Sequence, residues 1–173
     1  MIYIVRHGQT DWNKLGKNQG QTDIPLNETG INQAYELKEV LKDYNFDLVF
    51  SSPLKRALET ARIVVGDKVI TDDRLKERGN GILEGKTHDE IIKIVGTGNL
   101  YTDLVEDNTL GIESLDHIQE RVNSFFDEIL DKYKGKNILI VTHAGTIINI
   151  RYYFEKVSDT TVLKNCEVLK YDN

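Results

Sequence analysis

The sequence predicts an α/β protein with a mainly parallel sheet and helices on both of its faces. Three short apolar runs, at residues 1–5, 48–50 and 138–141, have the character of buried strands. Segments with helical periodicity follow them, and alternating strands and helices are typical of a parallel sheet covered on both faces. Each run also ends on polar residues, and ligands bind at the carboxyl ends of the strands in such sheets.

Capping residues and apolar spacing locate two helices and a strand in the first half of the chain. Residues 27–29 offer capping oxygens for a core-facing helix that is expected to run to about Asn45, with apolar positions at Ile31, Ala34, Leu37, Leu41 and Tyr44. Ser52 as the cap and Pro53 in the first helical position predict a second helix that stops near Gly66, with a stripe of Leu54, Leu58, Ala61 and Val65. A short strand is expected at residues 69–71.

The second half of the chain carries a weak helix pattern, a strong one and an edge segment. The weak pattern starts at Thr87 and stops at the glycines of residues 96–98. The strong one follows Ser114 and ends at residues 134–136, with apolar positions at Leu115, Ile118, Val122, Phe125, Phe126, Ile129, Leu130 and Tyr133. Another helix is expected after Gly145, and the β-formers of residues 161–171 predict one or two edge strands.

Two long segments, residues 8–26 and 99–113, lack clear periodicity. Loops of that length in a compact domain are usually functional lids or disordered, so these two are candidates to roof the strand ends. Tyr101, Leu104 and Leu110 are either part of such a lid or ordinary loop anchors.

Length and composition narrow the class of protein. The 173 residues suit a single domain, 1–173, and a formal charge of −6 argues against loose binding of nucleic acid. Cys166 is the single cysteine and has no partner for an intramolecular disulfide, and the first residues read as a core strand instead of a signal peptide. We therefore expect a soluble, cytoplasmic protein, because no apolar stretch approaches the roughly 18 to 20 residues of a membrane helix.

His7 is the first candidate for catalysis. It follows the first predicted strand, stands beside Arg6, and precedes Gly8, which lets backbone approach a ligand closely. A neighbouring guanidinium disfavours the imidazolium form, which keeps the ring neutral and nucleophilic. The alternative is a histidine that merely ends a strand.

The start of the second predicted helix carries two cations. Lys55 and Arg56 lie in its first turn, where the helix dipole disfavours positive charge by about 0.3–1 kcal/mol each. A phosphate at this helix N-terminus would offset both effects, and Arg56 is the better ligand because a guanidinium binds phosphate bidentately. The alternative is a solvated basic face, which is the reading we favour for Arg62.

His143 ends the most apolar of the predicted strands, and small residues follow it. From that position its ring can donate a hydrogen bond to a phosphoryl oxygen, whereas the alternative is a satisfied core histidine. Because strand ends meet at one edge of a parallel sheet, we expect His143 and His7 to share a site with the two arginines.

No motif for a metal or a nucleotide is present in the sequence. His88 and His117 have no ligand partners three or four residues away, and neither a cysteine pair nor a His-Glu-x-x-His pattern occurs. A Walker loop and a dinucleotide fingerprint are also missing. We expect neither a catalytic metal nor a cofactor.

Several dispersed motifs, read in order, resemble the histidine phosphatase superfamily and within it the phosphoglycerate mutase-like branch. They are Arg6-His7-Gly8-Gln9-Thr10 with Trp12-Asn13, Asp23-Ile24-Pro25-Leu26 with Gly30, Ser51-Ser52-Pro53-Leu54-Lys55-Arg56-Ala57 with Thr60-Ala61, Glu77 with Gly81 and Glu84-Gly85, and Thr142-His143-Ala144-Gly145. The resemblance spans nearly the whole chain and implies a phosphoglycerate mutase-like fold.

The resemblance also assigns roles to individual residues. It implies that His7 is the nucleophile that forms a phosphohistidine, and that Arg6, Arg56 and His143 hold the phosphoryl oxygens. Glu77 matches the proton donor of the family, a choice that spacing alone does not make between it and Glu84 or Asp73. In the first loop, residues that match substrate-contacting positions of the family are Asn13, Gln19 and Gly20.

The implied activity is metal-independent hydrolysis of a small-molecule phosphate ester. Phosphoryl transfer needs mainly alignment and charge stabilisation, which two guanidinium groups and two imidazoles supply. The alternatives are a cofactor-dependent phosphoglycerate mutase and, from another class, a non-catalytic phosphate-binding module. Residues 87–113 contain no arginine, whereas the cofactor-dependent mutases carry an arginine pair there, which favours hydrolysis.

The physiological ester is not identified by these motifs. The chain resembles α-ribazole phosphatases, but the same residues also suit broad-specificity phosphatases and fructose-bisphosphatases. Ile82-Leu83 stands where many members of the family have an aromatic residue before Glu-Gly, which alters one wall of the expected pocket. The oligomeric state is equally open.

Overall fold

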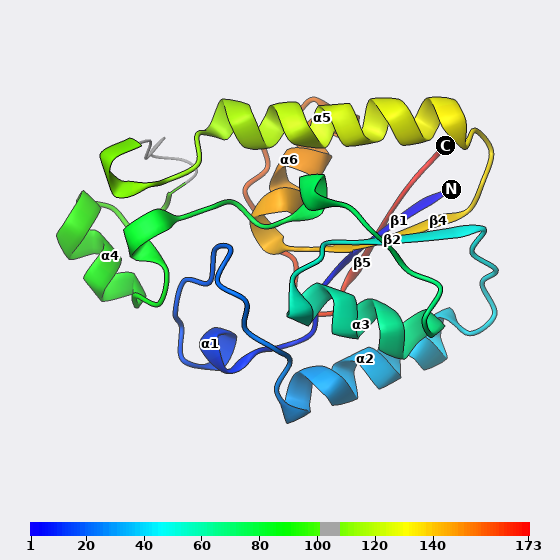
Figure 1. Cartoon of the computed structure of the whole chain (residues 1–173), viewed down its shortest axis with the longest axis horizontal. Helices are drawn as coiled ribbons and strands as arrows, with labels where there is room; N and C mark the ends of the chain where they lie inside the picture. The colour runs from blue at the N-terminus through cyan, green and yellow to red at the C-terminus, as the bar shows by residue number, and fades with distance from the viewer. Residues whose placement is uncertain (101–107) are drawn as a thin grey trace.

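The computed structural model describes residues 1–100 and 108–173, and a five-stranded sheet lies at its centre (Figure 1). The strands are β1 (Ile2–Arg6), β2 (Leu48–Ser51), β3 (Ile70–Thr71), β4 (Ile138–Thr142) and β5 (Val168–Tyr171). Their order across the sheet is β3-β2-β4-β1-β5, and β5 alone runs antiparallel to its neighbour. The predicted α/β class with a mainly parallel sheet is confirmed.

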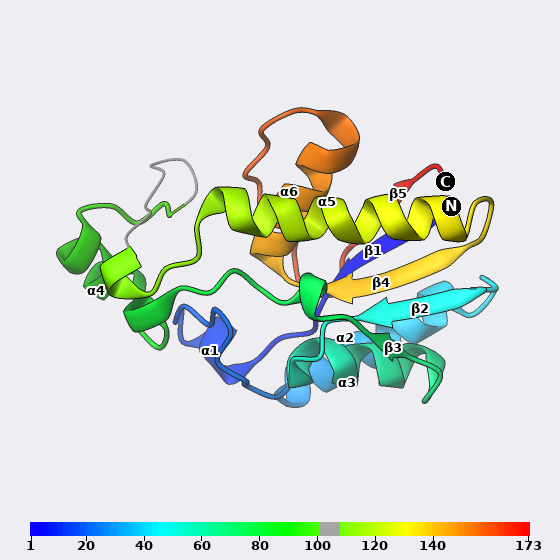
Figure 2. The ribbon, with the colours of Figure 1, turned by 45° about the horizontal axis from the view of Figure 1, so that its top comes forward.

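Helices cover both faces of this sheet (Figures 1 and 2). On one face lie α2 (Glu28–Leu41) and α3 (Lys55–Val65), and on the other lie α5 (Leu115–Lys132) and α6 (Ala144–Glu155). The remaining helices, α1 (Asp11–Lys14) and α4 (His88–Val95), lie beyond the end of the sheet toward which β2 and β4 point.

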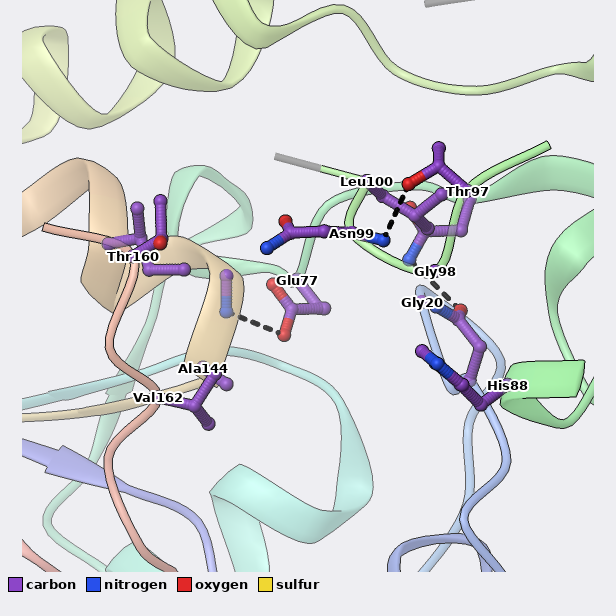
Figure 3. Close-up of a pocket in the computed structure, with 14 residues that line it drawn as sticks. Gly20, Glu77, His88, Thr97, Gly98, Asn99, Leu100, Ala144, Thr160 and Val162 are labelled. Carbon is purple, nitrogen blue, oxygen red and sulfur yellow. Dashed lines mark hydrogen bonds between the residues drawn. The ribbon is translucent and has the colours of Figure 1, made fainter. Parts of the chain in front are cut away.

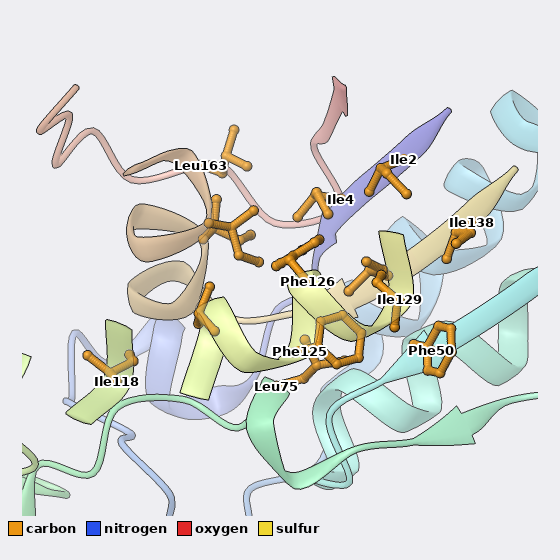
Figure 4. Close-up of a cluster of buried hydrophobic side chains, with 14 residues drawn as sticks. Ile2, Ile4, Phe50, Leu75, Ile118, Phe125, Phe126, Ile129, Ile138 and Leu163 are labelled. Atoms are coloured by element: carbon orange, nitrogen blue, oxygen red, sulfur yellow. The ribbon is translucent and has the colours of Figure 1, made fainter. Parts of the chain in front are cut away.

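The period-two geometry of the strands explains why both faces are apolar. Ile2 and Ile4 of β1 pack with α5 and α6, while Tyr3 and Val5 point to the opposite face and pack with α2 and α3. The strand β4 divides its residues in the same way. Figure 4 shows the larger cluster, in which Phe125 and Phe126 of α5 lie against the sheet. A strand buried on both faces reads in the sequence as a continuous apolar run.

Two helix boundaries differ from the prediction. The helix α2 ends at Leu41, because a tight turn follows in which the Tyr44 backbone N–H donates to the Leu41 carbonyl at 3.0 Å. Tyr44 then packs edge-on against Tyr3, with ring centroids 5.4 Å apart, and remains exposed, as does Ile31. These two residues therefore do not belong to the buried face of α2, which is formed by Gly30, Ala34, Leu37 and Leu41.

The helix α3 begins at Lys55 and has Leu54 at its N-cap, so the prediction of a Ser52 cap and Pro53 in the first turn is wrong. The Ser52 hydroxyl accepts a hydrogen bond from the Leu54 backbone N–H at 3.3 Å, which lies before the first helical residue, and it is 2.7 Å from Nε2 of His143. The carboxylate of Asp23 instead accepts a hydrogen bond from the Lys55 backbone N–H at 2.7 Å. A carboxylate from a distant loop thus occupies the N-terminus of this helix.

The other elements agree with the sequence in type. Thr87 and Ser114 cap α4 and α5, Gly96 ends α4, and one edge strand, β5, forms within residues 161–171. The loop of residues 8–26 is not wholly irregular, because Thr10 and Asn13 form a capping box around the short helix α1. Tyr101 and Leu104 lie outside the described residues, whereas Leu110 packs against a small cluster with Leu83, Ile91, Leu100 and Ile112. Within the described ranges, no helix is long and apolar enough to cross a membrane.

Candidate active site

The sheet order brings three strand ends together. Because β4 lies between β1 and β2, their carboxyl ends are adjacent, with Arg6 opposite Thr142 and Ser51 opposite Val141. The His7 backbone N–H donates to the Thr142 carbonyl at 3.0 Å, and the rings of His7 and His143 lie 5.1 Å apart. The two histidines that are 136 positions apart in the sequence thus face one point at the edge of the sheet.

The ring of His7 is buried and held in one tautomer. Its Nδ1–H donates to the carbonyl of Gly8 at 2.7 Å, which leaves Nε2 with an unshared electron pair. Burial lowers the pKa of His7 well below its ordinary value of 6.5, and the nearby charges of Arg56 and Arg6 lower it further. The ring is therefore neutral, although burial contributes more to this than the adjacent arginine that the sequence indicated.

His143 is also buried and neutral, and it has the opposite tautomer. The Nε–H of Arg56 donates to its Nδ1 at 3.1 Å, so its proton is on Nε2, which donates to the Ser52 hydroxyl at 2.7 Å. Its pKa is well below 6.5 because of burial and the charge of Arg56. His143 is therefore a hydrogen-bond donor at this site, while His7 presents a lone pair.

Arg56 is fully buried and fixes the first loop to the site. Its Nη2 donates to the carbonyl of Gly20 at 2.7 Å, and its Nη1 donates to the carbonyl of Thr22 at 2.8 Å. Burial lowers its pKa to about 10, a value that leaves the guanidinium charged at neutral pH. The neighbouring Lys55 is exposed, and its Nζ lies 3.9 Å from Oδ2 of Asp23. Arg62 is also exposed, as the sequence predicted.

Arg6 supplies a second guanidinium beside His7. Its Nη1 donates to the carbonyl of Leu163, and burial lowers its pKa against the opposing charge of Glu77. Its Nε–H is buried and has no hydrogen-bond partner among the described residues. Such an orphaned donor is rare in folded proteins and is a place for an acceptor atom from a ligand.

The carboxylate of Glu77 lies at the N-terminus of α6 (Figure 3). Its oxygens accept hydrogen bonds from the backbone N–H groups of Gly145 at 3.0 Å, Thr146 at 3.1 Å and Arg78 at 2.9 Å. These three backbone donors hold the carboxyl group in one position at the start of the helix. The small residues after His143 make this approach possible, because the helix begins immediately beside the site.

The first-loop residues are placed by packing inside the protein. A Cβ on Gly8 would lie 2.5 Å from the backbone oxygen of Gly30, so this glycine permits loop–helix packing, whereas the sequence suggested close approach of a ligand. Gly20 has a φ of +50°, and a Cβ at this position would clash with Oε1 of Glu84, so the position requires glycine. Gln19 accepts a hydrogen bond from the Thr10 hydroxyl at 2.8 Å, and Asn13 accepts one from the Thr10 backbone N–H.

Sequence reasoning missed two parts of this arrangement. Ser52, whose hydroxyl accepts a hydrogen bond from His143, had only the pattern of a helix cap in the sequence. Arg121 of α5 donates to the Glu77 carbonyl at 3.1 Å and pairs with Glu113 at 2.8 Å, yet it lies among many charged residues of an amphipathic helix. No local pattern distinguishes an arginine that turns inward from one that faces solvent.

A pocket of 590 Å³ opens beside Glu77 and the start of α6 (Figure 3). Its walls are formed by Asn18, Gly20, Glu77, Asn80, His88, Thr97, Gly98, Asn99, Leu100, Ala144, Gly145, Ile148, Thr160 and Val162. Neither histidine of the pair is among these lining residues, and both are buried. Three lining residues are close to the buried catalytic candidates. The Gly20 carbonyl accepts a hydrogen bond from Arg56, Ala144 follows His143 in the chain, and the charge of Glu77 acts on Arg6. Among the described residues, no group of three or more His, Cys, Asp or Glu is placed to hold a metal ion.

Comparison with known proteins identifies the family. The family model of the histidine phosphatase superfamily (branch 1) matches residues 2–171. The chain belongs to the histidine phosphatase superfamily. The resemblance predicted from the motifs is thereby confirmed.

Individual members of the superfamily share the fold and much of the sequence. The uncharacterized phosphatase PhoE of Bacillus subtilis is 38% identical over 149 residues, which are 84% of this chain and 72% of that protein. Phosphoserine phosphatase of Entamoeba histolytica, solved with 3-phosphoglyceric acid, has a TM-score of 0.81 and 32% identity over 96% of this chain and 87% of that one. A putative α-ribazole-5′-P phosphatase of Escherichia coli has a TM-score of 0.77 and 30% identity, with coverages of 88% and 79%.

This histidine phosphatase is accordingly an enzyme of the phosphatase class with a phosphoglycerate mutase-like fold. Its relatives also include proteins named as phosphoglycerate mutases. Membership in the superfamily therefore does not determine the substrate, nor whether the phosphoryl group is released to water or transferred to another hydroxyl. Both must be argued from the geometry of the site.

Proposed function

We propose that this histidine phosphatase hydrolyses small-molecule phosphate monoesters without a metal, through a phosphohistidine on His7. The observation that carries the proposal is the hydrogen bond from His7 Nδ1–H to the Gly8 carbonyl at 2.7 Å. It leaves Nε2 unprotonated, and burial keeps the ring neutral. A neutral imidazole nitrogen held in one orientation is an activated nucleophile.

In the first step, Nε2 of His7 attacks phosphorus and the ester P–O bond breaks. The leaving alkoxide takes a proton from Glu77, whose resulting carboxylate is stabilised by the N–H groups of Gly145 and Thr146. The orphaned Nε–H of Arg6 donates a hydrogen bond to one phosphoryl oxygen, and Arg56 adds its positive charge. The Nε2–H of His143, which donates to the Ser52 hydroxyl in this structure, turns to a second phosphoryl oxygen when the ester binds.

In the second step, water attacks phosphorus and the N–P bond breaks. Glu77 takes the proton of that water, which returns it to its initial state, and inorganic phosphate leaves. Asn13, Gln19 and Gly20 complete the proposal as residues of the loop that encloses the substrate, and Gly8 supports that loop. The first loop is connected to the reacting centre through the hydrogen bonds from Arg56 to Gly20 and Thr22.

The proposal is tested by phosphate release from a panel of esters in the presence of EDTA. The panel contains an aryl phosphate, 3-phosphoglycerate and a ribazole phosphate, and the variants are His7→Ala and, as the matched control, His117→Ala at an exposed position. We expect release by the parent and by the control, and none by His7→Ala. A phosphate adduct on His7, detected by mass spectrometry after alkaline quenching, is the second expected result.

Glu77→Gln tests the role of the proton donor. Loss of general acid catalysis is expected to lower kcat for an alkyl phosphate by about 10²–10⁴-fold, and to affect an aryl phosphate less because its leaving group needs no proton. The parent protein would instead be a mutase if it transferred phosphate between the hydroxyl groups of a glycerate without releasing it to water. Binding of phosphate without either reaction would establish a non-catalytic module.

A further inference from the structure

The pocket beside Glu77 is walled by neutral polar groups. Its side chains include the amides of Asn18, Asn80 and Asn99 and the hydroxyls of Thr97 and Thr160. In Figure 3, Thr160 and Val162 form the wall opposite Gly20 and His88, and Glu77 lies between these walls. No lysine or arginine lines the pocket among the described residues, and the sequence of residues 101–107 contains neither.

One wall carries a buried acceptor that nothing in the described chain satisfies. Asn80 is 7% exposed, and its Nδ2 donates to Oδ1 of Asn18 at 3.0 Å. Its backbone N–H donates to the Glu84 carboxylate at 3.1 Å. These two bonds fix the amide, yet Oδ1 of Asn80 has no hydrogen-bond partner among the described residues. Buried side-chain oxygens nearly always have a donor, which a bound ligand can supply.

Charge decides what kind of ligand suits this pocket. Glu77 lines it, and Glu84 lies close behind it, where its carboxylate accepts from the backbone N–H of Gln21 at 2.9 Å. A second anionic group on the substrate, such as a carboxylate, would face this negative field without a guanidinium or ammonium to pair with. A hydroxyl group donates to Asn80 and accepts from neighbouring amides without that penalty.

We infer that the pocket holds the alcohol half of the substrate, and that this half is a neutral, hydroxyl-bearing group such as a polyol or sugar. Asn80 is the specificity-determining residue, with Oδ1 accepting a hydrogen bond from a substrate hydroxyl. The inference rests on the proposed phosphatase function and names its substrate class. It separates this chain from a phosphoglycerate enzyme, whose substrate carries a carboxylate.

Two pairs of esters that differ in one charge test the inference. Glycerol 3-phosphate is compared with 3-phosphoglycerate, and glucose 6-phosphate with 6-phosphogluconate, so that the number of carbon atoms and the phosphate are matched in each pair. Each ester is assayed as a substrate and as a competitive inhibitor of aryl phosphate hydrolysis. We expect the neutral member to have at least a tenfold higher kcat/KM and the lower inhibition constant.

Two variants locate the selectivity in the pocket. Asn80→Ala is expected to lower kcat/KM for glucose 6-phosphate about tenfold more than for the aryl phosphate, whereas Asn45→Ala, at an exposed site, changes neither. Val162→Arg places a cation on an exposed part of the pocket wall, so it is expected to raise kcat/KM for 6-phosphogluconate relative to glucose 6-phosphate.

The outcomes distinguish the two levels of the proposal. Absence of hydrolysis for every ester, or hydrolysis that persists in His7→Ala, refutes the phosphatase mechanism. Hydrolysis that depends on His7 but is equal or faster for the acid members refutes the inference alone. The inference is also refuted if neither neutral ester is hydrolysed or inhibits, or if Asn80→Ala lowers the sugar and aryl activities equally.

Discussion

Lowering the pH from 7.5 to 5.5 should destabilise this protein through its two buried histidines. Because burial lowers the pKa of both His7 and His143 well below 6.5, we expect both rings to stay neutral in the folded state over this interval. In the unfolded chain both titrate near 6.5. The unfolded state therefore binds more protons as the pH falls, and stability falls with it.

The magnitude follows from proton linkage. A histidine that stays neutral when folded and titrates at 6.5 when unfolded loses about 1.4 kcal/mol of stability between pH 7.5 and 5.5. Two such histidines together lose about 2.7 kcal/mol over the same interval. Above pH 7.5 the contribution is constant, because both rings are then neutral in the folded and the unfolded state.

Urea unfolding at pH 7.5, 6.5 and 5.5 measures this dependence. The comparison protein is the double variant His7→Gln with His143→Gln, in which the titrating groups are replaced by neutral amides, and His117→Gln serves as the control at an exposed site. A carboxylate with a lowered pKa, such as Asp72, loses its contribution at lower pH and is common to all three proteins. Equal pH dependence of the free energy of unfolding in the parent and the double variant would refute the reasoning.

Two further predictions concern packing and a buried ion pair. Gly8→Ala is expected to cost about 1–3 kcal/mol because its Cβ would meet the Gly30 oxygen at 2.5 Å, whereas Gly79→Ala, with its nearest neighbours at 3.7 Å, should change stability by less than about 0.5 kcal/mol in the same thermal unfolding assay. Arg121→Met should cost about 3–5 kcal/mol, because it leaves the largely buried Glu113 carboxylate without its guanidinium. Adding Glu113→Leu should restore part of that loss, and a double variant no more stable than Arg121→Met in denaturant unfolding would contradict this account.

The sequence by itself determined the fold class and the family. The strands β1, β2 and β4 are buried on both faces, so each of them is a continuous run of apolar residues in the sequence. This pattern can be recognised without knowing which strands are neighbours in the sheet. Helix caps at Asn27, Thr87 and Ser114 are equally local, because a side chain satisfies backbone groups within three residues of itself. The dispersed motifs around His7 and His143 were sufficient to predict the superfamily that the comparisons establish.

Only the tertiary structure decided how these residues act on one another. The tautomer of His143 depends on Arg56 and Ser52, and the first of these is 87 positions away in the chain. At the start of α3, the Lys55 backbone N–H donates to the Asp23 carboxylate and not to a ligand. Asn80 is held by Asn18 of the first loop, and this packing leaves its Oδ1 buried without a donor among the described residues. Such contacts join segments that have no relation in sequence spacing. Their energies depend on burial, which is a property of the whole packed molecule and not of a local pattern.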